Sequence, residues 1–449
     1  MPTTAVGPPA APPPDPLVLI RSRKYAVLLV MTAVLGVPIS AMAFGFLALV
    51  SELQSLTYSD LPEALGFDGT PSWWPIPLLA LAGLLVALAI SRLPGEGGHK
   101  PAEGLVAKGS PTAAELPGIA LAAVASLGAG VVLGPEAPLI ALGGGLAVFA
   151  VRAVKRDVQP SSAAVLGAAG SFAAVSTLLG SPLLGAFLLM EAAGLGGAMM
   201  GVVLVPGLLA AGVGALIFTG LGSWTGLGTY SLALSQVPQA HRPDLAGFGW
   251  ALVIGVASAV LGAGIHRSGL FLQGRVDRRR VVLTTVAGAL VGVLALVYAE
   301  WTGRPASDVL YSGQSALGPL LAGQAGYTAG TLVVLVVCKA LAYSLSLSGF
   351  RGGPVFPSMF VGAAGGLALA HLPGLDTTSG FAMGVGALCV AMLKLPMTAV
   401  LLATLLLGSE GLTVMPLVIV AVVVSYVLTF KLAPAPAPAP APPPAAVSP

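Results

Sequence analysis

Long apolar segments recur along most of this 449-residue chain, and they constrain its fold more than any other feature. A helix needs about 20 apolar residues to cross the hydrocarbon core of a bilayer. Runs of about this length lie at 25–50, 199–221, 246–265, 281–299, 328–347 and 412–430. Charged residues make up only 8% of the chain and the mean hydropathy is +0.95, far from the soluble range of roughly a quarter charged. The chain is therefore predicted to be an integral membrane protein.

Other apolar runs are short or interrupted, which predicts tilted or discontinuous helices. They lie at 138–151, 162–180, 182–193, 355–371 and 379–407. The 60 glycines and 38 prolines of the chain suit helices that approach closely and break at membrane depth. The predicted fold class is all-α: a polytopic bundle of short, tilted and broken helices.

The ends and the basic residues predict the topology. Residues 1–24 and 432–449 are rich in Pro and Ala and are expected to be disordered tails. Clusters of Lys and Arg at 21–24, 152–156 and 275–280 place these loops and the N-terminus in the cytoplasm by the positive-inside rule. These loops account for the formal net charge of +3 without a nucleic-acid partner. The expected location is the plasma membrane, with lipid as a partner.

One short motif occurs twice. "GPEAPLIALG", from Gly134, and "GPVFPSMFVG", from Gly353, both read Gly-Pro-x-x-Pro, four apolar or small residues, then Gly. The second prolines are Pro138 and Pro357, and each copy is followed by another Pro-containing turn. Matched elements in one order indicate duplicated halves. We expect repeats at 25–220 and 245–431, joined by 221–244.

Each motif predicts a helix start at membrane depth. Proline is favoured in the first helical turn, where its missing N–H has no intrahelical partner. Such a start directs free backbone N–H groups and the positive end of a helix dipole at whatever lies in front of it, which favours an anion. Two starts from two halves would bind a small anion through the backbone amides of Glu136, Ala137, Val355 and Phe356. Two prolines that merely kink helices are the alternative.

Glu136 stands between two prolines in an otherwise apolar stretch. A carboxylate at membrane depth is costly and therefore a functional candidate. When ionised it would itself occupy the anion site, and when protonated it could move aside. Glu136 is therefore predicted to be a gate and a proton carrier; the alternative is a helix cap at a wet rim.

The motifs resemble those of the CLC family of chloride channels and proton/chloride antiporters over about residues 25–430. "GPEAP" is similar to the Gly-Arg/Lys-Glu-Gly-Pro motif, with Glu136 at the gating glutamate, and "GGPVFP", residues 352–357, to Gly-x-Phe-x-Pro. The resemblance implies inverted repeats and a homodimer with one pore per subunit.

Three departures from the family pattern concern selectivity and coupling. "GGHKP", residues 97–101, places Gly98 where the family has an anion-binding serine. Glu191 matches the first acid of a Glu-Glu pair, but Ala192 stands at the second, which serves antiporters as inner proton acceptor. Glu191 is equally expected to carry protons or to serve a structural role. Tyr426 lies too early in the sequence to replace the family's anion-binding tyrosine.

The sequence therefore predicts transport of a small inorganic anion, most simply chloride, that is passive or weakly coupled to protons. A stoichiometric antiporter and an inactive membrane scaffold are the alternatives. A proton-coupled cation carrier is disfavoured because helix N-termini repel cations. No catalytic signature or metal-ligand spacing stands out, so we expect no enzyme activity, no metal and no cofactor.

Overall fold

The computed structural model describes residues 18, 20–105, 109–194, 198–232, 234, 236–323 and 326–433. Within these residues the regular structure is helical, apart from one isolated backbone bridge. The predicted tails fall largely outside them. Eight described helices are long and apolar enough to cross a membrane, and five shorter apolar helices accompany them. The prediction of an all-α polytopic bundle is confirmed.

Among the described residues, the first half of the chain contributes seven main helices. A π-helical turn (Leu56–Asp60) and α3 (Leu61–Ala64) extend the first of them. The seven are α2 (Arg23–Ser55), α4 (Pro75–Arg92), α5 (Leu116–Gly128), α6 (Glu136–Val154), α7 (Pro160–Ala174), α8 (Pro182–Ala192) and α9 (Ala198–Thr225).

The described part of the second half contributes seven more, together with the short α12 (Leu317–Leu321). They are α10 (Leu245–Val276), α11 (Arg280–Thr302), α13 (Ala329–Gly349), α14 (Val355–Leu369), α15 (Thr377–Leu393), α16 (Pro396–Leu405) and α17 (Ser409–Leu432).

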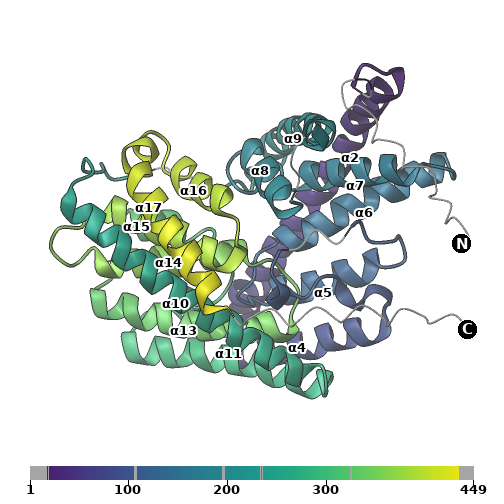
Figure 1. The fold of residues 1–449 in the computed structure, drawn as a ribbon. Helices are drawn as coiled ribbons and strands as arrows, with labels where there is room; N and C mark the ends of the chain where they lie inside the picture. The colour runs from purple at the N-terminus through teal and green to yellow at the C-terminus, as the bar shows by residue number, and fades with distance from the viewer. Residues whose placement is uncertain are drawn as a thin grey trace, which may run out of the picture.

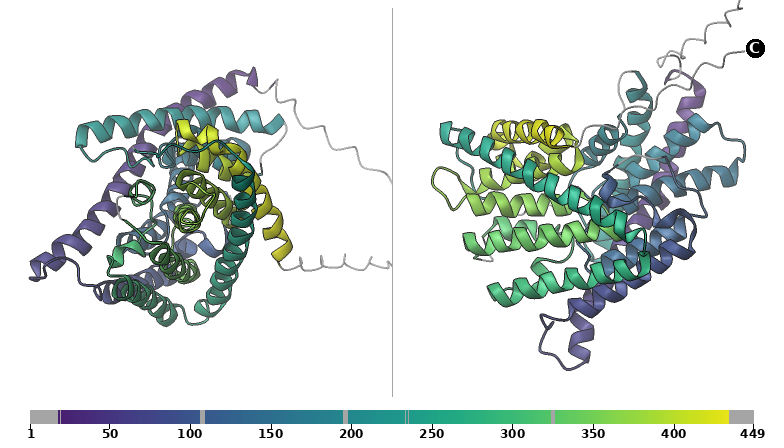
Figure 2. Two further views of the ribbon diagram at one scale, coloured as in Figure 1. Left: turned by 90° about the vertical axis from the view of Figure 1, so that its left-hand side faces the viewer. Right: turned by 60° about the horizontal axis from the view of Figure 1, so that its bottom comes forward.

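The two halves repeat one packing scheme. In the first, α6 packs on α7, α2 on α9 and α5 on α6; in the second, α14 packs on α15, α10 on α17 and α13 on α14. Figure 1 shows the first half on the right and the second on the left, with α4 and α11 side by side below. The right-hand view in Figure 2 shows the same division. The halves therefore have matched elements in matched order, as the repeated motif predicted.

Glycine pairs allow the same close helix contact in both halves. A Cβ at Gly143 of α6 would clash with the carbonyl of Gly170 on α7, and the reverse clash also holds. In the second half, Gly362 of α14 and Gly384 of α15 stand in the same relation. Small residues at such crossings let the backbones touch, which is how membrane helices gain packing energy.

Local signals explain many helix starts. Pro75, Pro160, Pro182 and Pro396 stand in the first turns of α4, α7, α8 and α16. Asp and Thr caps accept backbone N–H groups at the starts of α10, α13 and α15.

Two predicted boundaries differ from the helices. The run at 138–151 was expected to be short, but α6 extends from Glu136 to Val154 and is long enough to span. Helix α9 continues to Thr225, into the predicted connecting segment. By contrast, α14 and α15 are short, as predicted.

Candidate functional site

The two motifs meet at the centre of the molecule. Gly134 and Gly353 form an antiparallel bridge in which each backbone N–H donates to the other's carbonyl, at 2.8 and 2.6 Å. Both residues occupy the first position of their motif. Equivalent residues that pair in antiparallel fashion are related by a two-fold axis between them, so the chain passes through the two motifs in opposite directions. The repeats are therefore inverted, as the fold class predicted.

Helices α6 and α14 both begin just after this bridge. The first residue of α6 is Glu136 and the first of α14 is Val355, each preceded by a proline. Pro138 and Pro357 lie in the first turns and are buried. The two N-terminal ends thus face one small region, where their positive dipole ends favour negative charge.

The Glu136 carboxylate occupies that region. Its side chain has no solvent exposure, and Oε1 accepts a hydrogen bond from the Val355 backbone N–H at 2.5 Å. A Cβ at either Gly134 or Gly353 would overlap the carboxyl group, so both glycines leave space for it. This location excludes the wet-rim cap considered above. It also means that the Val355 amide, predicted to be free for an anion, already has a carboxylate on it.

The second carboxylate oxygen, Oε2, is buried and has no hydrogen-bond partner within the described part of the chain. A buried oxygen without a donor is unfavourable by about 1–3 kcal/mol. Val355 is thus the one other described residue that donates a hydrogen bond to the carboxylate.

Two cavities lie next to residue 136: the residue before it lines one, and the residue after it lines the other. The first, which we name the tyrosine cavity, has a volume of about 620 Å³ and is lined by Tyr58, Tyr230, Tyr311 and Pro135, together with serine and glutamine side chains. Its described lining contains no charged side chain. Pro135 lines this cavity and Ala137 lines the other one, so Glu136 lies between them.

The second, the charged cavity, has a volume of about 920 Å³. Gly98 and Ala137 both line it, so the structure brings these two predicted residues together. Gly98 adopts a positive φ of 90°, which a side chain would strain. The charged lining residues are Glu96, Lys100, Glu103, Glu115 and Arg152, and His99 also lines this cavity. Val355 and Phe356 are fully buried and line neither cavity.

We name the Gly134–Gly353 bridge and the first residues of α6 and α14 the cradle. Tyr343 supports it, and the sequence analysis missed this residue. Its buried hydroxyl donates to the carbonyl of Pro354 at 2.9 Å, directly before the amide that binds Glu136. The helical spacing of Tyr343 from Lys339 and Ser346, two other polar residues of α13, could have indicated it.

Arg351 lies close to the second motif. Its side chain is buried, and its guanidinium donates to the carbonyl of Glu96 at 2.9 and 3.2 Å and to that of Phe350 at 3.1 Å. Its backbone N–H donates to Ser126 Oγ at 3.1 Å. The arginine therefore ties the start of the second motif to the first half.

Glu191 lies away from Glu136, on α8. Its Oε1 accepts from Met397 N–H at 3.0 Å, and its Oε2 accepts from the Thr398 N–H at 2.7 Å and hydroxyl at 2.6 Å. The carboxylate thus caps the N-terminus of α16 across the two halves. Ala192 lines the charged cavity instead.

Asp277, just after α10, joins the Gly98 loop to the second half. Its carboxylate contacts Lys100 Nζ at 2.7 Å and Arg280 Nη2 at 3.4 Å. Partial burial raises the pKa of Asp277, but the hydrogen bond and charge of Lys100, with those of Arg280, outweigh burial and hold this pKa below its ordinary value.

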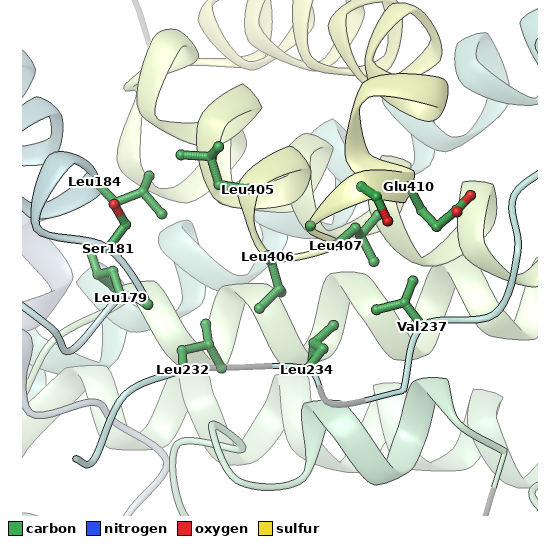
Figure 3. Close-up of a pocket in the computed structure, with 13 residues that line it drawn as sticks. Leu179, Ser181, Leu184, Leu232, Leu234, Val237, Leu405, Leu406, Leu407 and Glu410 are labelled. Atoms are coloured by element: carbon green, nitrogen blue, oxygen red, sulfur yellow. The ribbon is translucent and has the colours of Figure 1, made fainter.

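A third cavity, of about 420 Å³, lies between the start of α8, the end of α16 and residues near 232–237 (Figure 3). Leucines form most of its wall. Its acid, Glu410, accepts a hydrogen bond from the Ala240 N–H at 2.9 Å. None of the predicted site residues lines this cavity. In the described ranges no group of three His, Cys, Asp or Glu side chains could hold a metal.

A fold that directs helix N-termini from inverted halves at one buried site defines an inverted-repeat membrane transport protein. The sequence profile of the family described as Voltage gated chloride channel matches residues 82–429, and the chain belongs to this family. The resemblance to CLC proteins is thereby confirmed, and the general activity is ion transport across a membrane.

Relatives agree with this assignment. The chain is similar to "Putative ion-transport protein YfeO" of Escherichia coli O139:H28 (strain E24377A / ETEC), at 29% identity over 356 residues, 79% of this chain and 81% of the relative. Its fold resembles that of a slow cyanobacterial Cl⁻/H⁺ antiporter, with a TM-score of 0.70, 21% identity and coverage of 90% of this chain and 94% of that one. A CLC-type fluoride/proton antiporter gives a TM-score of 0.66 at 19% identity, with coverage of 91% and 96%.

Proposed function

We propose that this protein conducts a small inorganic anion, chloride first, through the site between the starts of α6 and α14, and that Glu136 gates it. The observation that carries the proposal is the position of the Glu136 carboxylate. It is buried between two cavities and takes the Val355 amide that an anion would use.

The gating step follows from electrostatics. Ionised Glu136 and a chloride ion carry the same charge and compete for the same helix ends. When the carboxylate takes up a proton, its attraction to the Val355 N–H weakens, and the side chain can leave. The freed amide and dipole ends then bind the anion, and the tyrosine and charged cavities supply its paths in and out.

The orientation in the membrane and the oligomeric state are proposed from the sequence. The charged cavity is lined by Lys100 and by Arg152, which belongs to the basic cluster at 152–156, so we place this cavity on the cytoplasmic side of the plasma membrane. The tyrosine cavity then faces outward. The family resemblance supports a homodimer with one pore per subunit.

We propose passive or weakly proton-coupled transport. Ala192 supplies no inner acid. Three donors hold the Glu191 carboxylate against α16, so Glu191 would have to break these hydrogen bonds to carry a proton. Stoichiometric antiport is the second candidate, since the two solved structures compared above are those of proton antiporters. A transport-inactive scaffold is the third.

Purified protein in chloride-loaded liposomes tests the proposal, with anion release and external pH recorded together for wild type and Glu136→Ala. We expect chloride release that increases in the variant, with little linked proton movement. Proton uptake in fixed ratio to chloride would favour the antiporter. Release from neither protein, although both are folded and inserted, would favour the scaffold.

A further inference from the structure

Lys339, in the middle of α13, is a buried cation without a carboxylate partner at its ammonium among the described residues. Its side chain is 1% exposed. The ammonium donates to three backbone carbonyls, those of Asp308 at 2.9 Å, Val309 at 3.2 Å and Leu310 at 2.7 Å. It also lies 4.3 Å from the centre of the Phe360 ring, whose face attracts a cation. All three ammonium donors are thus used on one short segment.

That segment leads directly into the wall of the tyrosine cavity. Tyr311, the next residue, has a positive φ of 58°, which is uncommon for a side-chain-bearing residue. Its backbone N–H donates to the Gly130 carbonyl at 2.9 Å, and its ring packs against Tyr58 with centroids 5.4 Å apart. Ser312 and Gln314 follow in the same lining. The position of this wall therefore depends on the segment that Lys339 binds.

The other side of the segment is also anchored. The Asp308 carboxylate accepts hydrogen bonds from the hydroxyls of Tyr298 at 2.9 Å and Tyr327 at 2.8 Å. Phe360 packs against Gly313 as well as against the ammonium. The contact with Gly313 is so close that a Cβ at this position would clash with the Phe360 side chain. The wall is thus held between α13, through Lys339, and α14, through Phe360.

The same face of α13 also holds the cradle. Residues 339, 343 and 346 are spaced i, i+4 and i+7, so their side chains share one helix face. Tyr343 binds the Pro354 carbonyl before α14, and Ser346 Oγ accepts the Val132 N–H at 3.3 Å in the first half. One rigid helix thus fixes the cavity wall and both sides of the cradle.

We infer that Lys339 is a positioning residue that fixes the position of the tyrosine-cavity wall, at that end of the pathway. It does so by binding residues 308–310 to the face of α13 that also carries Tyr343, whose hydroxyl contacts the cradle. The inference rests on the proposed anion pathway for its effect on transport, but the effect on the wall itself does not require transport. Removing the ammonium leaves the buried carbonyls of Val309 and Leu310 and the part-buried carbonyl of Asp308 without their donor, and the segment gains freedom to move.

Thiol labelling in detergent tests the position of the wall. Ser312→Cys reports on the tyrosine cavity and Ala164→Cys on the charged cavity, in a chain with the buried Cys338 and Cys389 replaced by Ala. Lys339→Met keeps the apolar stem and removes the ammonium. We expect the probe at 312 to react about tenfold faster and the probe at 164 at an unchanged rate.

Several outcomes would overturn the inference. Equal acceleration of both probes means that Lys339 merely stabilises the whole fold, and no acceleration at 312 means that the wall does not depend on it. Should Lys339→Met fail to fold, Phe360→Leu loosens the same clamp, and we expect a smaller increase at 312, about threefold. An unchanged rate in that variant contradicts the inference as well.

A matched control lies one turn away on the same helix. Tyr343→Phe removes only the hydroxyl that binds Pro354, so the rate of the 312 probe should stay at the wild-type value. In liposomes, Lys339→Met should alter the dependence of efflux on chloride at the tyrosine-cavity side only. If wild type carries no anion, the proposed function fails while the labelling result still decides the role of Lys339.

Discussion

Neutralising Glu136 without changing its size tests the gate most cleanly. In Glu136→Gln the amide oxygen can still accept the Val355 N–H, but the charge is gone. A charge-assisted hydrogen bond contributes about 1.5–3 kcal/mol and a neutral one about 0.5–1.5 kcal/mol. When Glu136 is ionised, its contact with the Val355 N–H is of the charge-assisted kind. The substitution therefore weakens the closed state by roughly 1–1.5 kcal/mol, and about 1.4 kcal/mol corresponds to tenfold in an equilibrium.

Chloride efflux from liposomes over an acid-to-neutral pH series measures this change. Wild-type efflux should rise as the pH falls, because protonation removes the charge that holds Glu136 in place. Glu136→Gln should give about tenfold faster efflux at neutral pH, with little pH dependence. Glu410→Gln is the matched control, because Glu410 also accepts a backbone N–H but lies at the third cavity. Identical wild-type and Glu136→Gln profiles would refute the reasoning.

Three further predictions follow from the contacts. Gly353→Ala places a methyl group where the carboxylate lies, so in a Glu136→Ala background it should reduce chloride efflux at least about tenfold; unchanged efflux would locate the anion elsewhere. Glu191→Gln and Thr398→Val should each lower the stability of the protein in detergent, measured by thermal melting, without altering proton movement. The hydroxyl contact that Thr398→Val removes contributes about 1 kcal/mol. A change in the proton-to-chloride ratio in Glu191→Gln alone would instead identify Glu191 as a proton carrier. Asp277→Asn should cost less than about 1 kcal/mol at neutral pH and nothing once the pH has fallen through the lowered pKa of Asp277, as a melting series would reveal.

Local signals predicted the centre of this protein well. Proline in a first turn specifies a helix start without help from distant residues, and so the starts of α6 and α14 could be placed from the two motifs. The repeat then implied that Gly134 and Gly353 are equivalent, and the structure pairs them directly. Glu136 was recognisable because a carboxylate in an apolar run needs a reason to be there.

Contacts between distant segments could not be predicted in this way. The occupant of the Val355 amide and the cap that Glu191 places on α16 depend on how the two halves meet. The carbonyls around Lys339 depend on how α13 packs against a segment about 30 residues earlier in the chain. A usable signal did exist on α13, where Lys339, Tyr343 and Ser346 interrupt an apolar run at helical spacing. It indicated a shared face, but not what that face binds.

The central claim is that an anion and the Glu136 carboxylate share one site. Crystals of Glu136→Ala grown in bromide would test it most directly, because bromide can be located by its anomalous scattering. The account predicts a bromide peak beside the Val355 amide, between Gly134 and Gly353, and no such peak in wild type at neutral pH. Bromide bound elsewhere in the variant, with this cradle empty, would contradict it.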